Sequence, residues 1–294
     1  HQEIEITVKE KNNSLETIPN QNILPISIKE EYTMPKIGIK VDNETNGSDL
    51  VNVDFLYHLV DFENDTESKS NFNNLPIYLV ALIDHSKKVK DIINDIKDYI
   101  VSKKINVDKL LICPKIYLNS FQPAGEWPLV PKLGDYYKQA KIQFPEIQIF
   151  SGMVTNFTEL NRKKPDGEFY GINFSFTPIV HDASDYGVLD TPNSIKFILN
   201  SINNFSKDTP IHIGPMTLGM HFNPYGEKLA ANIDKVRLEM TDLDPRHDSL
   251  ISLNWTIAVF SETLSKNTKY ITIASLKGIH GILTENNQKR PLFY

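Results

Sequence analysis

The sequence FSGMVTNFTELNR, residues 150–162, decides the fold, because an apolar run reaches Ser151-Gly152 and then opens into polar side chains. We expect a buried strand to end at this glycine. The polar residues that follow are Asn156, Thr158, Glu159, Asn161 and Arg162. Parallel α/β proteins bind ligands at the carboxyl ends of their strands, so this pattern predicts a functional site. Thr158 and Glu159 are also typical of a helix N-terminus, which leaves a purely structural interpretation open.

The same arrangement of an apolar run followed by polar residues recurs at 170–181, 211–224 and 270–281. Over the whole chain, apolar runs predict eight strands, at 37–41, 51–60, 75–83, 110–113, 147–150, 170–176, 211–213 and 270–274. Apolar spacing of about 3.6 residues predicts helices at 89–101, 133–144, 194–205 and 250–264. This alternation predicts an α/β protein with a (β/α)8 TIM-like barrel, and a doubly wound open sheet is the alternative.

The first part of the chain differs from the rest. Links 42–50 and 63–74 are polar and leave little room for a helix, so we expect the barrel to be irregular in its first half. Residues 1–34 include the alternating run Ile4, Ile6 and Val8, which predicts a short N-terminal β segment, interpreted as the remnant of a preceding domain. The barrel domain is then expected at 35–294. Because the chain begins with His1, we expect it to be part of a longer protein.

Composition excludes several classes of partner. The 294 residues are 40% hydrophobic and 23% charged, which is typical of a globular protein with one large core. The net charge is -6 and the basic residues are scattered, so nucleic acid is not an expected partner. No apolar run approaches the roughly 18 residues of a membrane span, and we expect a cytoplasmic protein. The single cysteine, Cys113, lies in an apolar run and is expected to be a buried thiol.

Absent motifs narrow the chemistry. The chain has no G-x-S-x-G, no H-E-x-x-H and no glycine-rich phosphate loop, so we expect no cofactor. A metal-dependent hydrolase is an alternative, because several histidines fall near predicted strand ends: His58, His85, His181, His221 and His280. No two of them form an H-x-H or H-x3-H pair, and we therefore favour a site without a metal.

Several motifs occur together in one order along the second half of the chain. They are FTELNR at 157–162, His181 with Asp182 and Asp185, GPMTL at 214–218 with FNP at 222–224, and DPRHDSL at 244–250. Together they resemble the TIM-barrel domain of the D-apionate lactonase family. The resemblance implies a hydrolase of carbohydrate catabolism that opens a sugar-acid lactone by water attack. Its expected ligand is a small carbohydrate or a sugar-acid lactone.

Residue chemistry and inferred position suggest the roles at such a site. Glu159 is the expected general base or acid, with Arg162 and His181 as its catalytic partners, because carboxylates and imidazoles move protons and cations stabilise an oxyanion. The expected substrate-binding residues are Asn156, Asn161, Asp185, Thr217, His221 and Asn223. His221 is also a candidate for charge stabilisation.

One position departs from the family pattern. The pattern has a glutamate after the last strand, in a Y-E-T-T-G-like stretch, whereas residues 274–278 here read ASLKG with Ser275 at that place. Two alternatives therefore stay open. One is a glycosidase-like barrel, which needs two carboxylates about 5 to 9 Å apart, with Glu159 and Asp185 as candidates. The other is a non-catalytic carbohydrate-binding barrel.

Overall fold

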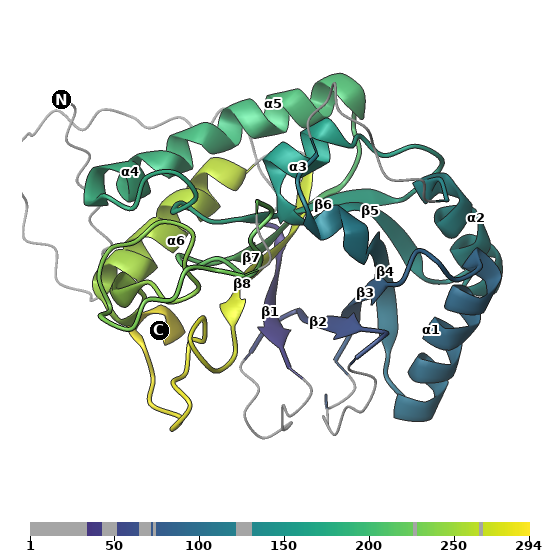
Figure 1. Cartoon of the computed structure of the whole chain (residues 1–294), viewed down its shortest axis with the longest axis horizontal. Coiled ribbons are helices and arrows are strands. Elements are labelled where there is room, and N and C mark those ends of the chain that lie inside the picture. Colours follow the sequence, from purple (N-terminus) through teal and green to yellow (C-terminus); the bar gives the residue numbers. More distant parts are fainter. Residues whose placement is uncertain are drawn as a thin grey trace, which may run out of the picture. The chain divides into compact units, whose positions relative to one another are not determined.

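A parallel barrel closes in chain order in the described part of the protein, with β8 pairing back to β1 (Figure 1). The computed structural model describes residues 34–42, 52–64, 72, 75–121, 131–225, 228–264 and 267–294. The strands are β1 Lys36–Val41, β2 Phe55–Asp61, β3 Ile77–Ile83, β4 Val107–Pro114, β5 Gln148–Asn156, β6 Gly171–Phe176, β7 Ile211–Met216 and β8 Thr268–Ser275. The predicted TIM-like barrel is confirmed, and the open sheet is excluded because the sheet has no edge strand.

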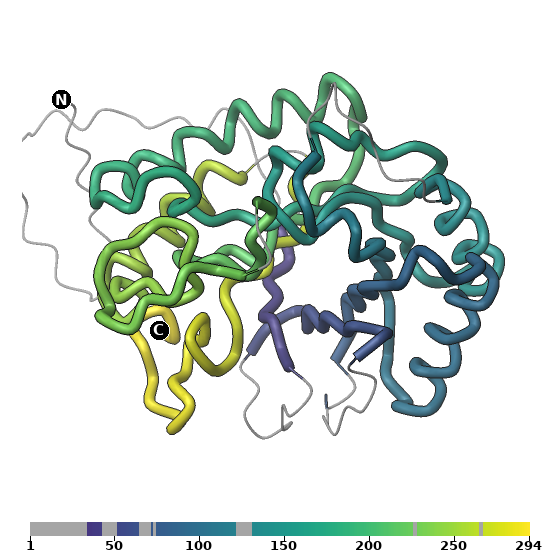
Figure 2. Tube along the Cα trace, in the orientation of Figure 1, coloured from purple at the N-terminus to yellow at the C-terminus, as the bar shows by residue number. Residues whose placement is uncertain are grey.

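The helices cover the outside of this barrel, as the Cα trace from α1 to α6 shows (Figure 2). Their bounds are α1 Val89–Lys103, α2 Leu133–Gln143, α3 Phe157–Arg162, α4 Asp185–Asp190, α5 Ile195–Phe205 and α6 Leu250–Thr263. Short 3-10 helices are η2 Lys115–Leu118, η3 Thr191–Ser194, η4 Pro245–Asp248 and η5 Pro291–Phe293. The four predicted helices are present with ends shifted by one or two residues, whereas α3 and α4 are one-turn helices that the periodicity did not predict.

The first half of the barrel is irregular, as predicted. The described residues between β1 and β2, and between β2 and β3, contain no helix. Contacts group Tyr32–Tyr294 into one compact unit. The predicted N-terminal β segment lies outside the described residues, so it and the boundary after residue 34 stay predictions. No described helix is both long and apolar enough to cross a membrane.

The barrel interior is filled by aromatic rings around a buried histidine. His212 is fully buried, with Nδ1 2.5 Å from Asn173 Oδ1 and Nε2 2.8 Å from Thr272 Oγ1. Asn173 Nδ2 donates to Met153 O, so its oxygen faces the imidazole and Nδ1 carries the proton. Burial holds the pKa of His212 well below its ordinary value. This neutral ring on β7 is hydrogen-bonded to residues of β6 and β8 and so links the three strands.

β5 does not end at Ser151-Gly152, and that prediction was wrong. The strand continues to Asn156, because Met153 and Val154 pack into the core with 1% exposure each. Gly152 has φ of 126°, and a Cβ there would lie 2.0 Å from Asn173 O. The pairing with β6 shifts in register after Gly152. The strand therefore extends beyond Gly152 to Asn156 and passes directly into α3.

Candidate active site

The carboxyl ends of β5, β6 and β7 carry the three central residues of the predicted site. Glu159 follows β5, His181 follows β6 and His221 follows β7. Because all strands of the barrel are parallel, these residues lie at the same end of it. A cleft of about 420 Å³ opens there, between α3, the loop after β6 and the loop after β7. Its lining includes Asn156 and His181.

Glu159 is a buried carboxyl group without a partner. It lies in the first turn of α3 with 4% of its surface exposed, and neither carboxyl oxygen has a hydrogen bond of acceptable geometry among the described residues. Burial is the main cause that raises its pKa, although the nearby Ser120 hydroxyl and the Arg162 charge act in the opposite direction. A carboxyl group in this state binds a proton more strongly than one in water.

Arg162 lies beside this carboxyl group and joins three loops. Its Nη1 donates to the Ser120 hydroxyl, while the Ser120 N–H donates to Pro224 O at 2.7 Å. Burial, and then the charge of Glu159, raise the pKa of Tyr225, whereas Arg162 lowers it. Glu159, Arg162 and Tyr225 are therefore close enough to act on each other. The segments after β4, β5 and β7 meet at this point.

His181 lies on the outer side of the cleft. Its ring is exposed, and its centroid is 6.1 Å from that of Tyr225. The structure thus brings His181 to the same cleft as Asn156, but at the solvent-facing rim. Its predicted catalytic role stays a prediction.

His221 lies deeper and forms a pair with His280 from the loop after β8. The two ring centroids are 4.2 Å apart. The Nε2 atom of His221 is buried without a partner among the described residues, although other atoms of the residue keep some exposure. Burial, then the charges of His280 and Lys40, hold its pKa well below the ordinary value, so the ring is neutral. A small cavity of about 10 Å³ joins His221 to Thr155 and Asn156.

Thr217 and Asn223, two of the predicted substrate-binding residues, have partners within the protein. Thr217 donates to Gly219 O at 2.6 Å, and Asn223 accepts from the Tyr225 N–H at 2.9 Å while donating to Lys228 O. Asn161 is exposed on α3 and lines none of the cavities described here. These contacts shape the loops of the mouth, and substrate binding by these side chains stays a prediction.

Asp185 is held by two arginines. Its carboxylate lies 3.0 Å from Arg246 Nη1 and 2.8 Å from Arg237 Nη2. Arg246 is 5% exposed and also binds Asp244 through two hydrogen bonds. The glycosidase alternative required Asp185 as a second carboxylate, and here that group is engaged in an ion-pair network.

His58 was wrongly placed at the mouth. It lies within β2, and its Nε2 is 2.8 Å from the Tyr99 hydroxyl on α1, so the ring faces the helix layer. Burial lowers its pKa to about 4. Alternation along the strand explains the direction, because its neighbour Tyr57 packs inside the barrel against His212. Among the described residues, no three His, Cys, Asp or Glu side chains are grouped so that they could hold a metal ion.

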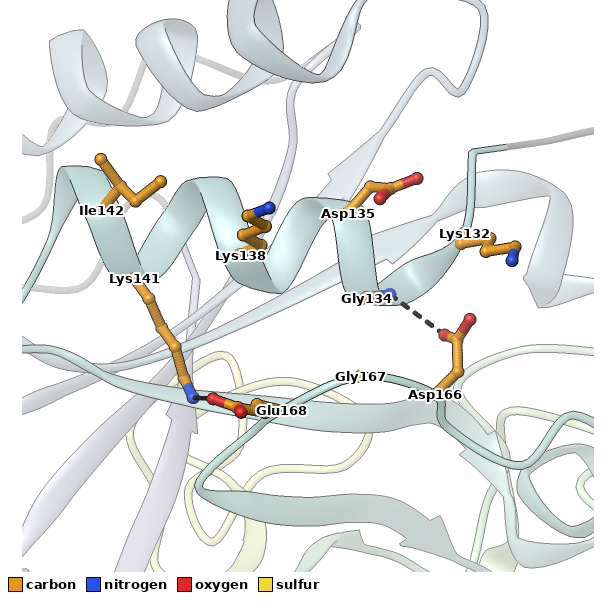
Figure 3. A pocket seen from close by; sticks show the side chains of 9 residues that line it. All are labelled: Lys132, Gly134, Asp135, Lys138, Lys141, Ile142, Asp166, Gly167 and Glu168. Atoms are coloured by element: carbon orange, nitrogen blue, oxygen red, sulfur yellow. Dashed lines mark hydrogen bonds and ion pairs between the residues drawn. The ribbon is translucent and has the colours of Figure 1, made fainter.

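A larger cavity, of about 590 Å³, lies along the outer face of α2 (Figure 3). Two contacts join polar groups that line it: Asp166 accepts from the Gly134 N–H at 3.0 Å, and Lys141 contacts Glu168 at 3.3 Å. The side chains around it are mostly exposed. We therefore place the chemistry at the barrel mouth rather than in this surface groove.

Residues 61–294 match the family described as D-apionate lactonase, TIM barrel domain. The chain belongs to this family. D-apionate lactonase from Brucella anthropi is 30% identical over 298 residues, a match that covers 92% of this chain and 49% of that protein. The chain thus spans about half the length of this relative. The resemblance seen in the sequence motifs is confirmed.

Solved structures with the same fold include two glycosidases. The GH2 β-galacturonidase from Eisenbergiella tayi bound to galacturonate has a TM-score of 0.54 and 12% identity over 89% of this chain and 50% of that chain. The β-glucuronidase of Ruminococcus gnavus has a TM-score of 0.56 and 8% identity over 88% and 49%. At this identity, the likeness shows the barrel fold alone.

Two members of this lactonase-family mouth were missed in the sequence. Tyr225 follows the FNP motif and was not named among the predicted residues. Lys40 lies on β1 between Ile39 and Val41. A lysine inside an alternating apolar strand is a signal that could have been used. No sequence pattern indicated that Glu159 is buried, because α3 is too short to show an amphipathic pattern.

Proposed function

We propose that this chain is a lactonase that opens a sugar-acid lactone by attack of water, in carbohydrate catabolism. The buried, unpartnered carboxyl group of Glu159 beside Arg162 carries this proposal. Membership of the D-apionate lactonase family supports it. The substrate class that follows from the relative's name is a branched aldonolactone whose product is D-apionate.

Glu159 is the proposed general base and then the general acid. As a carboxylate it accepts a proton from water while the water oxygen attacks the lactone carbonyl carbon. The ring C–O bond then breaks, and the same proton passes to the leaving ring oxygen, which gives the open hydroxy acid. Burial strengthens proton binding by this carboxylate more than the neighbouring donors weaken it, so Glu159 is a better base than an exposed carboxylate.

Arg162 and Tyr225 are the proposed donors to the tetrahedral oxyanion. A guanidinium and a phenol lie next to the base, and fixed donors at the developing negative charge are a large contribution to ester hydrolysis. His181 and Asn156 face the cleft and are proposed to bind substrate hydroxyl groups. A cleft of about 420 Å³ matches a small carbohydrate in size.

Replacement of the base tests the proposal. Glu159→Gln keeps the shape of the side chain but cannot accept the proton, so we expect turnover of an aldonolactone panel to fall by about 10²- to 10⁴-fold. The assay is a pH-stat measurement with the spontaneous opening in buffer subtracted. Glu168→Gln is the matched control, because Glu168 is 93% exposed on the outside of the barrel. Wild-type turnover by Glu159→Gln, with an unchanged melting temperature, would remove Glu159 from the mechanism.

A further inference from the structure

Lys40 is an inward-facing lysine at the carboxyl end of β1. It pairs in register with Tyr57 on β2, whose ring packs in the barrel interior 5.7 Å from His212. Register partners place their side chains on the same face of a sheet. Its neighbours Ile39 and Val41 are buried and point the other way. The ammonium group of Lys40 therefore extends inside the barrel, toward the mouth.

This ammonium group has no partner in the described part of the chain. None of the recorded ion pairs or hydrogen bonds involves its Nζ atom, and the opposing charge that acts on it comes from the exposed Asp42. A cation taken out of water without a partner is unfavourable. Such a group is normally compensated by an anion, and among the described residues the carboxylate that acts on it is that of the exposed Asp42.

Two imidazoles lie close to Lys40, which is the register partner of Ser275 at the end of β8. The charge of Lys40 acts on both His221 and His280, whose ring centroids are 4.2 Å apart. His280 lies over the end of β8, because its carbonyl accepts from the Ser275 N–H at 2.9 Å. His221 is neutral and its buried Nε2 has no partner. One ammonium group and two imidazole rings thus lie close together. The His280 ring is hydrogen-bonded to the Met220 backbone, and the described carboxylate that acts on Lys40 is that of the exposed Asp42.

We infer that Lys40, His221 and His280 form a carboxylate-binding pocket that receives the acid group of a sugar acid. The pocket deepens the proposed lactonase function and rests on it for the identity of the ligand. His221 also lines the small cavity that contains Asn156, so the pocket adjoins the side of the mouth where Glu159 lies. A carboxylate formed by ring opening and a carboxylate already present on the lactone would be bound by the same chemistry.

Calorimetry with matched ligands tests this pocket at neutral pH. The probes are D-ribonate, its neutral lactone D-ribono-1,4-lactone, and D-glucaro-1,4-lactone, which keeps a second carboxylate. We expect Lys40→Met to weaken ribonate binding by about tenfold or more, while Lys40→Arg retains it and the neutral lactone is unaffected. Weakened glucarolactone binding in Lys40→Met would show that a carboxylate already on the substrate is also received there. Lys36→Met is the control, because Lys36 is an exposed lysine on the same strand.

Lys40→Met should fold, since it replaces a half-buried lysine by an apolar side chain of similar length. Lys40→Gln is the second variant if the melting temperature falls. Equal ribonate affinity in wild type and Lys40→Met, or no ribonate binding by wild type, would overturn the pocket. Dependence of ribonate binding on Lys40 in a protein that hydrolyses no lactone would keep the pocket and reject the proposed function. Hydrolysis that depends on Glu159, together with ribonate binding that does not depend on Lys40, would keep the proposed function and reject the pocket.

Discussion

Lys40 on β1 and Ser275 on β8 are register partners at the seam where the barrel closes. The Leu276 N–H donates to Lys40 O at 2.8 Å and fixes this pairing. The acidic residue that the sequence resemblance led us to expect at the position of Ser275 would face the ammonium group across the seam. A serine there leaves Lys40 without that carboxylate. In this chain the register partner of Lys40 is therefore an uncharged serine, as the inferred positive pocket requires.

Buried neutral histidines should make this protein sensitive to mild acid. Burial lowers the pKa of His58 to about 4 and that of His280 to about 3, and it also depresses those of His212, His221 and His247. The unfolded chain then binds more protons than the folded protein below the ordinary value of 6.5. Each ring should therefore remove about 1.4 kcal/mol of stability per pH unit as pH falls from that value toward its folded pKa.

Urea unfolding at several pH values measures this effect. His58→Gln should reduce the slope of the unfolding free energy against pH by the contribution of one histidine. Tyr99→Phe is the matched control, since it removes the hydrogen bond to His58 but keeps the titrating group. An identical slope in wild type and His58→Gln would show that His58 is protonated in the folded protein.

The barrel could be predicted from the sequence because eight apolar runs alternate with helical spacing, and parallel topology alone brings Glu159, His181 and His221 to one end. The end of β5 could not be predicted from the sequence. Its continuation depends on the positive φ of Gly152 and on a backbone contact with Asn173, which are set by packing across the barrel. The direction of His58 was predictable from strand alternation, whereas its hydrogen bond to Tyr99 was not.

The site was predicted in part for a related reason. Residue type and strand position made Glu159 and Arg162 candidates, but the burial of Glu159 and the contact of Arg162 with Ser120 depend on loops that meet only in three dimensions. Asp185 was assigned to substrate, and its binding by Arg246 joins segments 61 residues apart. Lys40 was missed because a single lysine in a short strand is usually solvated.

The Arg246 network should be a stability element of the mouth. Arg246→Met leaves the carboxylate of Asp244 buried and unpaired, because that side chain has 0% exposure. We expect a loss of about 3 to 5 kcal/mol in the free energy of unfolding. Arg237→Met is the control: this arginine is 57% exposed and pairs with the same Asp185, so its removal should cost about 0 to 1 kcal/mol. Equal losses would show that Arg246 is not the structural centre of the network.

The raised pKa of Glu159 should make the free energy of unfolding depend on pH. Its pKa is raised above the ordinary value of 4.5, so the folded state binds more protons than the unfolded state above that pH. Its contribution is then most favourable below pH 4.5 and is lost as pH rises through the folded pKa. Glu159→Gln should gain stability relative to wild type over this window. Denaturant unfolding of both proteins checks it, and a constant difference across pH would indicate an ordinary pKa.

Ser275→Glu should fill the inferred pocket from within. The new carboxylate would face Lys40 across the seam, so we expect an internal ion pair that competes with a bound sugar acid. Affinity for D-ribonate should fall by about tenfold, the same loss that we expect for Lys40→Met, while D-ribono-1,4-lactone should bind as it does to the wild type. Ser275→Gln is the control for size, because it adds a similar side chain without the charge. If both variants weaken ribonate equally, the effect is steric. If Ser275→Glu instead raises lactone turnover and leaves ribonate binding unchanged, the acidic group acts in catalysis and Lys40 is its partner rather than a receptor for the substrate.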